Sequence, residues 1–192
     1  MFKIVQNIIP LILFVSFSLN TLSAQNKTID TDKSTIIWKG HKITGSHDGT
    51  INFESGQLLY KNDELVGGEF IIDMTSINVT DLDGKSKGKL EGHLKSEDFF
   101  GVETHPKSKL VFTKVTKTDN GYEVIGDFTL KNITEPITFN LTVAEDSISS
   151  ELSIDRTKYD VRYGSKSFFN NLKNSAINDE FDLYVTLFLN SF

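Results

Sequence analysis

Histidines are the first side chains to examine for chemistry, because neutral imidazole binds metal ions and transfers protons near neutral pH. The chain has four of them, His41, His47, His93 and His105. A metal site needs several converging ligands, and no pair here has the i, i+4 spacing of a helical metalloprotease motif. The absence of cysteine from the sequence excludes thiolate metal sites, thiol nucleophiles and disulfides. We therefore expect no bound metal.

Paired carboxylates are the second candidates, since a hydrolase of the glycosidase type uses two of them across a cleft. Asp81 and Asp83 form one pair, and Glu97 and Asp98 form another. In a chain with 26 acidic residues such pairs arise by chance. The sequence also lacks the nucleophile elbow of serine hydrolases, the Walker loop and the dinucleotide fingerprint. We therefore expect a protein that is not an enzyme and that uses no catalytic cofactor.

Arg156 is a charged residue in an apolar pattern, because it has the same parity as Leu152 and Ile154. This parity predicts an inward-pointing guanidinium at the end of a strand. One interpretation is an ion pair with a nearby carboxylate. The other is stacking on Trp38, the only tryptophan, to close one end of a barrel. We favour the ion pair, because cation–π pairs are infrequent.

Residues 1–24 have the pattern of a cleaved signal peptide. Lys3 is the only charged residue before Lys27, and a 12-residue apolar run, residues 8–19, follows it. A membrane-spanning helix needs about 20 apolar residues, so the run is short, although an uncleaved anchor remains the alternative. Cleavage after Ala24 leaves a single domain, residues 25–192, with 19 basic and 26 acidic residues. We expect it to be periplasmic or secreted, without a stable membrane anchor.

From residue 35 onward, apolar and polar residues alternate with a period of two, which is typical of half-buried β-strands. Val66, Phe70 and Ile72, for example, share one face. Ser55-Gly56 separates two runs of opposite parity and predicts a bulge. The short connections predict antiparallel neighbours. Eight strands are expected, over residues 35–42, 48–60, 65–74, 108–117, 121–131, 133–144, 147–157 and 180–190.

Two longer stretches, residues 84–107 and 160–178, interrupt the strands. Leu90 and Leu94 have helical spacing in the first, and residues 167–172 give a second short candidate helix. Gly67-Gly68 within a strand indicates close packing or strong curvature. The fold class is all-β, as one domain of eight antiparallel strands that either close into a barrel or stack as a sandwich. Closure leaves no exposed edge, which favours the barrel.

The apolar faces of these strands supply the residues expected inside the barrel. A barrel of eight strands is wide enough to be filled by side chains or to hold one small ligand. Alternation does not choose between a filled and a hollow lumen. The candidates by parity are Phe53, Phe70, Ile72, Val124, Phe128, Phe139, Leu141, Leu183 and Val185.

Several separated motifs resemble the YceI-like family. Residues 92–100, Gly-His-Leu-Lys-Ser-Glu-Asp-Phe-Phe, followed by His105-Pro106, are similar to a signature of that family, as are residues 68–74, 126–131 and 154–157. The resemblance covers residues 28–190, and one departure is Asn132, where the family often has glycine. It implies an extended lipocalin-like antiparallel β-barrel of eight strands, exported from the cytoplasm. It also implies a polyisoprenoid, quinone-type or other amphiphilic lipid as ligand, and it brings no catalytic residues.

The function predicted from these observations is that of an exported lipid-binding protein, a carrier or scavenger with its ligand in the apolar lumen. A long apolar chain gains affinity by leaving water, at about 25 cal/mol per Å², so the lumen needs few polar groups. The alternative is a structural or stress-related interaction module whose barrel is filled and holds no ligand. The excess of 26 acidic over 20 basic residues argues against a nucleic-acid partner. A homodimer stays open.

Overall fold

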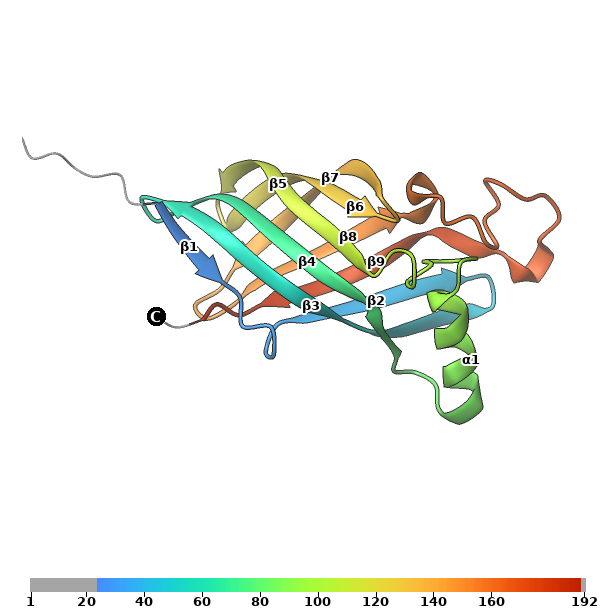
Figure 1. Ribbon diagram of the computed structural model, residues 1–192. Coiled ribbons are helices and arrows are strands. Elements are labelled where there is room, and N and C mark those ends of the chain that lie inside the picture. Colours follow the sequence, from blue (N-terminus) through green and yellow to red (C-terminus); the bar gives the residue numbers. More distant parts are fainter. Residues whose placement is uncertain (1–23, 191–192) are drawn as a thin grey trace, which may run out of the picture.

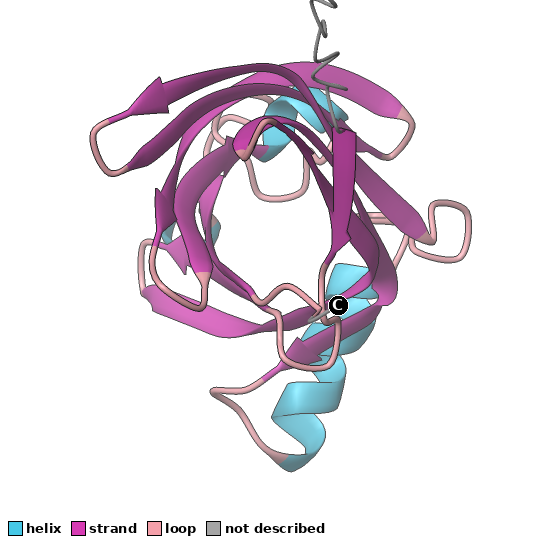
Figure 2. Ribbon diagram, turned by 90° about the vertical axis from the view of Figure 1, so that its left-hand side faces the viewer, coloured by secondary structure: helices cyan, strands magenta, loops and turns pink. Residues whose placement is uncertain are grey.

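The computed structural model describes residues 24–190, which form one antiparallel sheet closed into a barrel (Figures 1 and 2). The sheet order β3-β2-β9-β8-β7-β6-β5-β4 is closed by the pairing of β4 with β3, so eight strand positions complete the ring. The predicted eight-stranded antiparallel barrel is confirmed. The predicted signal peptide falls outside the described residues, except for Ala24. The strands are β1 (Ala24–Thr28), β2 (Thr35–Lys42), β3 (Gly45–Lys61), β4 (Glu64–Val79), β5 (Lys107–Thr118), β6 (Gly121–Leu130), β7 (Ile133–Val143), β8 (Ile148–Asp155) and β9 (Ile177–Leu187).

The short strand β1 continues β2 along the same edge of β3, so it adds no ninth position to the ring. It pairs with residues 57–61 of β3, while β2 pairs with residues 45–51 of the same strand. Its other side meets the chain beyond β9, where Ile29 bridges Leu189 and the Asn190 N–H donates to the Thr28 carbonyl at 3.0 Å. Alternation misses β1 because its residues, Ala-Gln-Asn-Lys-Thr, include no large apolar side chain.

Bulges decide which side chains face inward in the β3–β4 hairpin. The pairing shifts between Phe53 and Ser55, as the change of parity predicts. A second shift leaves Val66 without a partner, because Leu59 pairs with Gly67 and Tyr60 pairs with Leu65. The prediction that Val66 shares a face with Phe70 and Ile72 is therefore wrong: Val66 is 52% exposed, and Leu65 is buried instead.

Two hairpins use two-residue turns in which both residues have positive φ. Asn62 and Asp63 have φ values of 52° and 63°, and Lys131 and Asn132 have values of 50° and 62°. Such turns match the twist of the strands they join, and asparagine tolerates the left-handed region well. Asn132 therefore supports the turn even though it departs from the glycine that the resemblance leads one to expect.

The helix α1 (Gly84–Lys95) lies at one end of the barrel, beside the end of β4 (Figure 1). Leu94 is buried and Leu90 packs against the core, as their spacing predicts. Glu91 Oε1 accepts from the Val79 N–H at 2.9 Å, and Lys87 Nζ donates to Asn78 Oδ1 at 2.8 Å. Apolar and polar contacts together therefore dock α1 on this end, which we call the α1 end. The opposite end, where the β3–β4, β5–β6 and β7–β8 turns lie, is the hairpin end.

One single turn of 3-10 helix, η2 (Lys173–Ser175), lies in the second long stretch, and another, η1 (Arg156–Tyr159), directly precedes it. The predicted helix over residues 167–172 is therefore wrong: these residues form turns and irregular chain, and the helical turn η2 begins directly after them. There the Ser167 N–H donates to Ser165 Oγ at 3.1 Å, and Asn171 has a φ of 68°. A left-handed residue and a side chain that bonds the backbone both interrupt a helix.

Close packing at Gly68 gives a first testable prediction. A Cβ at this position would lie 2.8 Å from the Phe112 ring and 3.1 Å from Leu58. Gly68→Ala should therefore lower the free energy of unfolding by about 1–3 kcal/mol, because the core has no room for a methyl group. Gly88→Ala in α1 is the matched control, since a Cβ there meets nothing within 4 Å. The control should raise it by about 0.5–1 kcal/mol. Urea unfolding measures both, and equal effects would contradict the packing argument.

Candidate ligand-binding site

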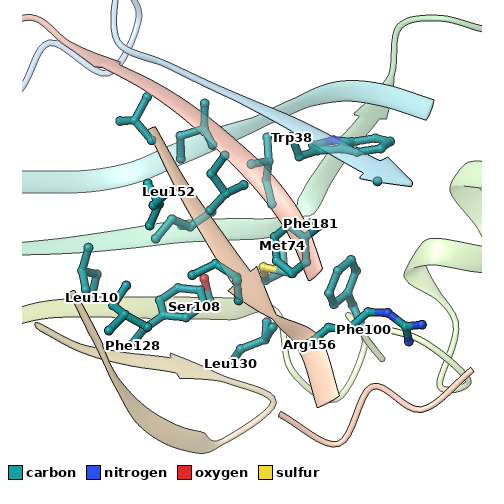
Figure 3. Close-up of a pocket in the computed structure, with 18 of the residues that line it drawn as sticks. Trp38, Met74, Phe100, Ser108, Leu110, Phe128, Leu130, Leu152, Arg156 and Phe181 are labelled. Carbon is teal, nitrogen blue, oxygen red and sulfur yellow. The ribbon is translucent and has the colours of Figure 1, made fainter. Parts of the chain in front are cut away.

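The barrel holds an apolar cavity (Figure 3), and it opens at the α1 end, where its exposed lining residues Asn178 and Glu180 lie. Its volume is about 160 Å³, and side chains from β2 to β9, from α1 and from the segment after α1 line it. Most of the lining is leucine, isoleucine and phenylalanine. The lining residues with polar side chains, beyond the Trp38 indole, are His41, Ser108, Ser150, Arg156, Asn178 and Glu180.

The structure brings most of the predicted lumen residues together around this cavity. Trp38 and Arg156, the predicted barrel-end residues, line it as well. Eight of the predicted lumen residues do so: Phe53, Phe70, Ile72, Phe128, Phe139, Leu141, Leu183 and Val185.

Val124 is the exception, and its position shows where the barrel is filled. It is fully buried but does not line the cavity. Leu58 of β3 and Leu65 of β4 are buried in the same way, also toward the hairpin end. The barrel is therefore packed at that end and hollow toward α1. Parity identifies an inward side chain, but it cannot tell at which height along the lumen the packing stops.

A row of phenylalanine rings crosses the cavity wall. Phe53 and Phe70 have ring centroids 5.9 Å apart, Phe70 and Phe112 are 5.6 Å apart, and Phe112 and Phe139 are 5.7 Å apart. These spacings and the tilted ring planes are those of favourable aromatic pairs. Because each ring rests on the next, the row braces the wall across β3, β4, β5 and β7 without filling the space in front of it.

A second aromatic group forms the α1 end of the cavity. Phe99 and Phe100 have ring centroids 4.8 Å apart, and Phe100 lies 6.3 Å from Phe181. The segment after α1 holds them in place through a tight turn with Gly101 at φ 56° and through Lys131 Nζ, which donates to the Phe99 carbonyl at 3.0 Å. Strand alternation does not find Phe99 and Phe100, because they are in a loop. The Asp-Phe-Phe of the motif at residues 92–100 was the only sequence signal for them.

Arg156 is buried at this end, with 1% of its surface exposed. Its Nε donates to the Asn178 carbonyl at 2.9 Å, Nη1 to that of Val161 at 2.7 Å and Nη2 to that of Ile177 at 3.2 Å. Figure 3 shows the guanidinium beside Phe100, directed away from the apolar side chains of the lumen. Arg156 therefore ties the chain that follows η1 to the start of β9.

The favoured interpretation of Arg156, an ion pair, is confirmed, whereas the stacking on Trp38 is wrong. The carboxylate is that of Asp179, with Nη2 and Oδ1 3.7 Å apart, and backbone carbonyls take the shorter bonds. The ring below the guanidinium is Phe99, at 5.4 Å, and not Trp38. Trp38 instead donates its Nε1 proton to the Thr50 carbonyl at 3.2 Å. The guanidinium has five donors, and the surrounding loop offers carbonyls for three of them.

The local charges follow from this burial. Burial lowers the pKa of the Arg156 guanidinium, and the Asp179 and Asp155 carboxylates oppose that shift. Burial acts to raise the pKa of Asp179, but hydrogen bonds from Ser165 and Ser167 and the charge of Arg156 outweigh it, so that pKa is lowered. Burial also raises the pKa of Tyr159 to about 12. Arg156 and Asp179 thus stay charged at neutral pH, whereas Tyr159 is neutral.

The residues first considered for chemistry do not converge. His41 Nε2 lies 2.8 Å from Asp182 Oδ2, and His47 Nδ1 lies 2.8 Å from Asp81 Oδ2, in separate places. Within residues 24–190, no group of three or more histidine and carboxylate side chains is arranged to hold a metal ion. No helix of the described chain is long and apolar enough to cross a membrane.

The order of the motifs and this barrel agree with a sequence comparison in which the YceI-like domain matches residues 28–189. The chain belongs to the YceI-like family. A UPF0312 protein of Photorhabdus laumondii is 35% identical over 92 residues, 48% of this chain and 46% of that protein. A UPF0312 protein of Pseudomonas putida is 41% identical over 51 residues, 26% of this chain and 27% of that protein. The matched region thus spans less than half the length of these curated relatives.

Solved structures show the same fold for other proteins of this kind. BcnA of Burkholderia cenocepacia superposes with a TM-score of 0.69 at 21% identity, covering 85% of this chain and 99% of that one. A polyisoprenoid-binding domain from Saccharophagus degradans, implicated in plant cell wall breakdown, gives a TM-score of 0.57 at 15% identity, covering 90% of this chain and 100% of that one. At these identities the likeness shows the YceI-like barrel and not its ligand.

The hydrogen bonds of Arg156 give a second prediction. Arg156→Lys should lower the free energy of unfolding by about 2–4 kcal/mol, because one ammonium cannot reach three carbonyls and leaves buried acceptors unpaired. Residues 160–176 should also become more sensitive to limited proteolysis. Arg162→Lys is the control, since Arg162 is exposed and its contacts, with the Asp160 carboxylate and the Phe168 ring, are ones that a lysine can also make; its effect should stay within about 0.5 kcal/mol. If the two variants unfold at the same urea concentration, Arg156 is not the tie described above.

Proposed function

We propose that this YceI-like protein binds the apolar chain of a polyisoprenoid or a similar long-chain amphiphile in its barrel, as a carrier or scavenger. The observation that carries the proposal is the apolar cavity, walled by leucine, isoleucine and phenylalanine and open toward the α1 end. A cavity lined by such groups binds apolar matter by removing its surface from water, without hydrogen bonds to direct it. The structural neighbour from Saccharophagus degradans, described as a polyisoprenoid-binding domain, supports the same class of ligand.

The length of the lined region suits a chain rather than a compact molecule. Lining residues of β9 run from Ile177 to Leu187. At about 3.3 Å per residue this is about 33 Å of strand. With the usual barrel tilt it corresponds to about 25 Å along the axis. A cavity of about 160 Å³ drawn out along this length suits a short extended stretch of a prenyl chain rather than a compact molecule, with the polar end at the mouth.

The groups at the mouth favour a head without strong negative charge. Glu180 lines the cavity, and Asp182 lies close by as the partner of His41. Arg156, the one cationic side chain of the lining apart from histidine, already donates to three backbone carbonyls. A phosphate would meet carboxylates without a free guanidinium to balance them. An alcohol or a quinone-type head is therefore the better match.

We further propose that the protein is exported and acts in the periplasm or outside the cell. The support is the charged start and short apolar run of residues 1–24. A domain without cysteine has no disulfides to form there, so its stability must come from its core alone.

Filling the cavity tests the proposed function. Leu152 of β8 lines the cavity, and Leu152→Trp would place a large apolar side chain where the lipid chain must lie. This variant should fold, yet lose most of its binding to a long-chain polyprenol, measured by native mass spectrometry after delipidation. Phe128→Asp is less informative, because Phe128 packs against the buried Tyr159 ring at 5.4 Å and a carboxylate there would endanger the fold.

Ser153→Trp is the matched control, since Ser153 is exposed on the outer face of the same strand. It should bind the polyprenol as the wild type does. The wild type should also bind the polyprenol at least as tightly as the corresponding polyprenyl phosphate. If neither compound binds, and protein purified from its own cells carries no adduct that is lost on denaturation, the filled-barrel interaction module becomes the better description.

The export proposal has its own measurement. Intact-mass analysis of protein recovered from the periplasm or the medium should show a chain that begins at Gln25 or within a residue or two of it. Retention of residues 1–24 in the recovered protein would rule out cleavage and favour the uncleaved anchor.

A further inference from the structure

The stretch between η1 and β9 presents large apolar side chains to solvent at the α1 end. Tyr163, Phe168 and Phe169 are 48%, 43% and 48% exposed. Ile43, at the β2–β3 turn, is also exposed, and its N–H donates to the Ala176 carbonyl at 3.4 Å, which places it beside this stretch. Single exposed apolar residues are ordinary, but several at one place mark an interaction site. In Figure 1 residues 160–176 form the orange-red loops that extend past the barrel end.

The exposure of these rings is built into the fold. Ser165 is fully buried, and its carbonyl accepts from the N–H groups of Phe168 and Phe169 at 3.3 and 3.0 Å. Ser167 Oγ donates to Asp179 Oδ2 at 2.5 Å, and the Ile177 N–H donates to the Gly164 carbonyl at 2.9 Å. The turn that carries the two phenylalanines is therefore anchored on its inner side, and this anchoring turns the rings outward.

The same stretch is basic in an acidic protein. Residues 157–176 contain four basic residues and one acidic residue, whereas the whole chain has a net charge of −6. The acidic residue, Asp160, is paired with Arg162, whose guanidinium also lies 4.9 Å from the Phe168 ring centroid. Three lysines, Lys158, Lys166 and Lys173, complete the set.

Helix α1 adds more positive charge next to this stretch. It has four lysines and one glutamate, and its His93 ring packs 4.3 Å from that of Tyr163. Acidic residues also lie at this end: before and after the helix, at residues 81–83 and 97–103, and at the start of β9, where Asp179 pairs with Arg156, Asp182 pairs with His41 and Glu180 lines the cavity. Exposed aromatic rings between lysines are the arrangement that binds the surface of an anionic bilayer, where rings enter the headgroup layer and ammonium groups meet lipid phosphates.

We propose that residues 160–176 form a docking surface for anionic membranes, with Tyr163, Phe168 and Phe169 as the inserting side chains. The occupant is a bilayer surface, because the lysines of this stretch and of α1 complement anionic lipid, and because the stretch is bonded through Gly164 to Ile177, which lines the cavity. Docking would place the mouth against the bilayer, so that an insoluble chain need not cross water; this last step alone rests on the proposed function. Binding is reversible, since three side chains and a few charges are far weaker than a membrane-spanning segment.

Vesicle flotation tests the docking surface directly. Wild-type protein should float with vesicles of phosphatidylcholine and phosphatidylglycerol, less with phosphatidylcholine alone, and less again at high salt. The double variant Phe168→Ser, Phe169→Ser should bind the anionic vesicles about tenfold more weakly or worse. The control is Ile37→Ser, Tyr184→Ser, which removes two exposed apolar residues paired on the outer wall of the barrel. That control should stay within about twofold of the wild type.

The charge contribution has a matched pair of variants as well. Lys166→Glu, Lys173→Glu should weaken binding by more than about tenfold, since each basic residue near an anionic surface contributes about 1 kcal/mol. Lys61→Glu, Lys114→Glu makes the same change in net charge at exposed positions of β3 and β5, and should have little effect. Equal losses in both pairs would show that net charge alone drives binding, and would overturn the proposed site.

Two further readouts separate this proposal from the proposed function. Neither phenylalanine lines the cavity, so the Phe168→Ser, Phe169→Ser variant should retain bound polyprenol as the wild type does. Loss of vesicle binding with polyprenol retained supports the docking surface, whereas wild-type protein that binds polyprenol but no vesicles refutes it. Sedimentation velocity without vesicles supplies the other readout: a wild-type dimer that the same variant dissociates would mean that a second copy covers the rings, and would overturn the membrane assignment.

Discussion

The closed ring of backbone hydrogen bonds is the constraint on which the rest of this structure depends. A hollow interior lined by phenylalanine and leucine would collapse if its wall could move inward, because contact between those side chains is favourable. The wall cannot move, since each strand of the ring is paired on both sides. The weakest place is between β7 and β8, which share two residue pairs, Thr142 with Ser149 and Val143 with Ile148. There η1 contacts β7 and β9, and its Tyr159 packs on Phe128 of β6, so the turn after β8 reinforces the wall where the pairing is short.

Within that ring, the interior is packed differently at the two ends of the barrel. At the hairpin end Leu58, Leu65 and Val124 pack in the ordinary manner of a core, and this part needs no ligand to be stable. Toward α1 the phenylalanine row of β3, β4, β5 and β7 gains its packing energy from ring against ring, along the wall rather than across the lumen. A protein without disulfides can therefore keep a cavity, because the loss of packing is confined to one end of a barrel whose other end is solid.

How much the sequence predicts depends on whether a residue's position is set locally. Phe70, Phe128 and Leu183 face the lumen because strands alternate, and alternation is visible in a single sequence. Val66 is the extra residue of a bulge in β4, opposite Leu59 and Tyr60 of β3. Its position therefore depends on the pairing with that strand. Phe99 and Phe100 reach the cavity through a loop that only tertiary contacts orient. For Arg156 the parity predicts burial, but its acceptors belong to residues 161, 177 and 178, which no local pattern connects to it.

Arg156 also links the two surfaces that a lipid would meet. It lines the cavity, and it holds the carbonyl of Val161 on one side and those of Ile177 and Asn178 on the other, which are the two ends of the stretch that carries the exposed rings. Moving that stretch away from the barrel would leave a buried guanidinium without acceptors, which is one of the most costly changes available to a folded chain. The exposed rings and the mouth therefore move together as one unit. One guanidinium connects Val161 to Ile177 and Asn178, at the entrance of the cavity, through hydrogen bonds of 2.7, 3.2 and 2.9 Å, so a displacement of Val161 disturbs the bonds at that entrance.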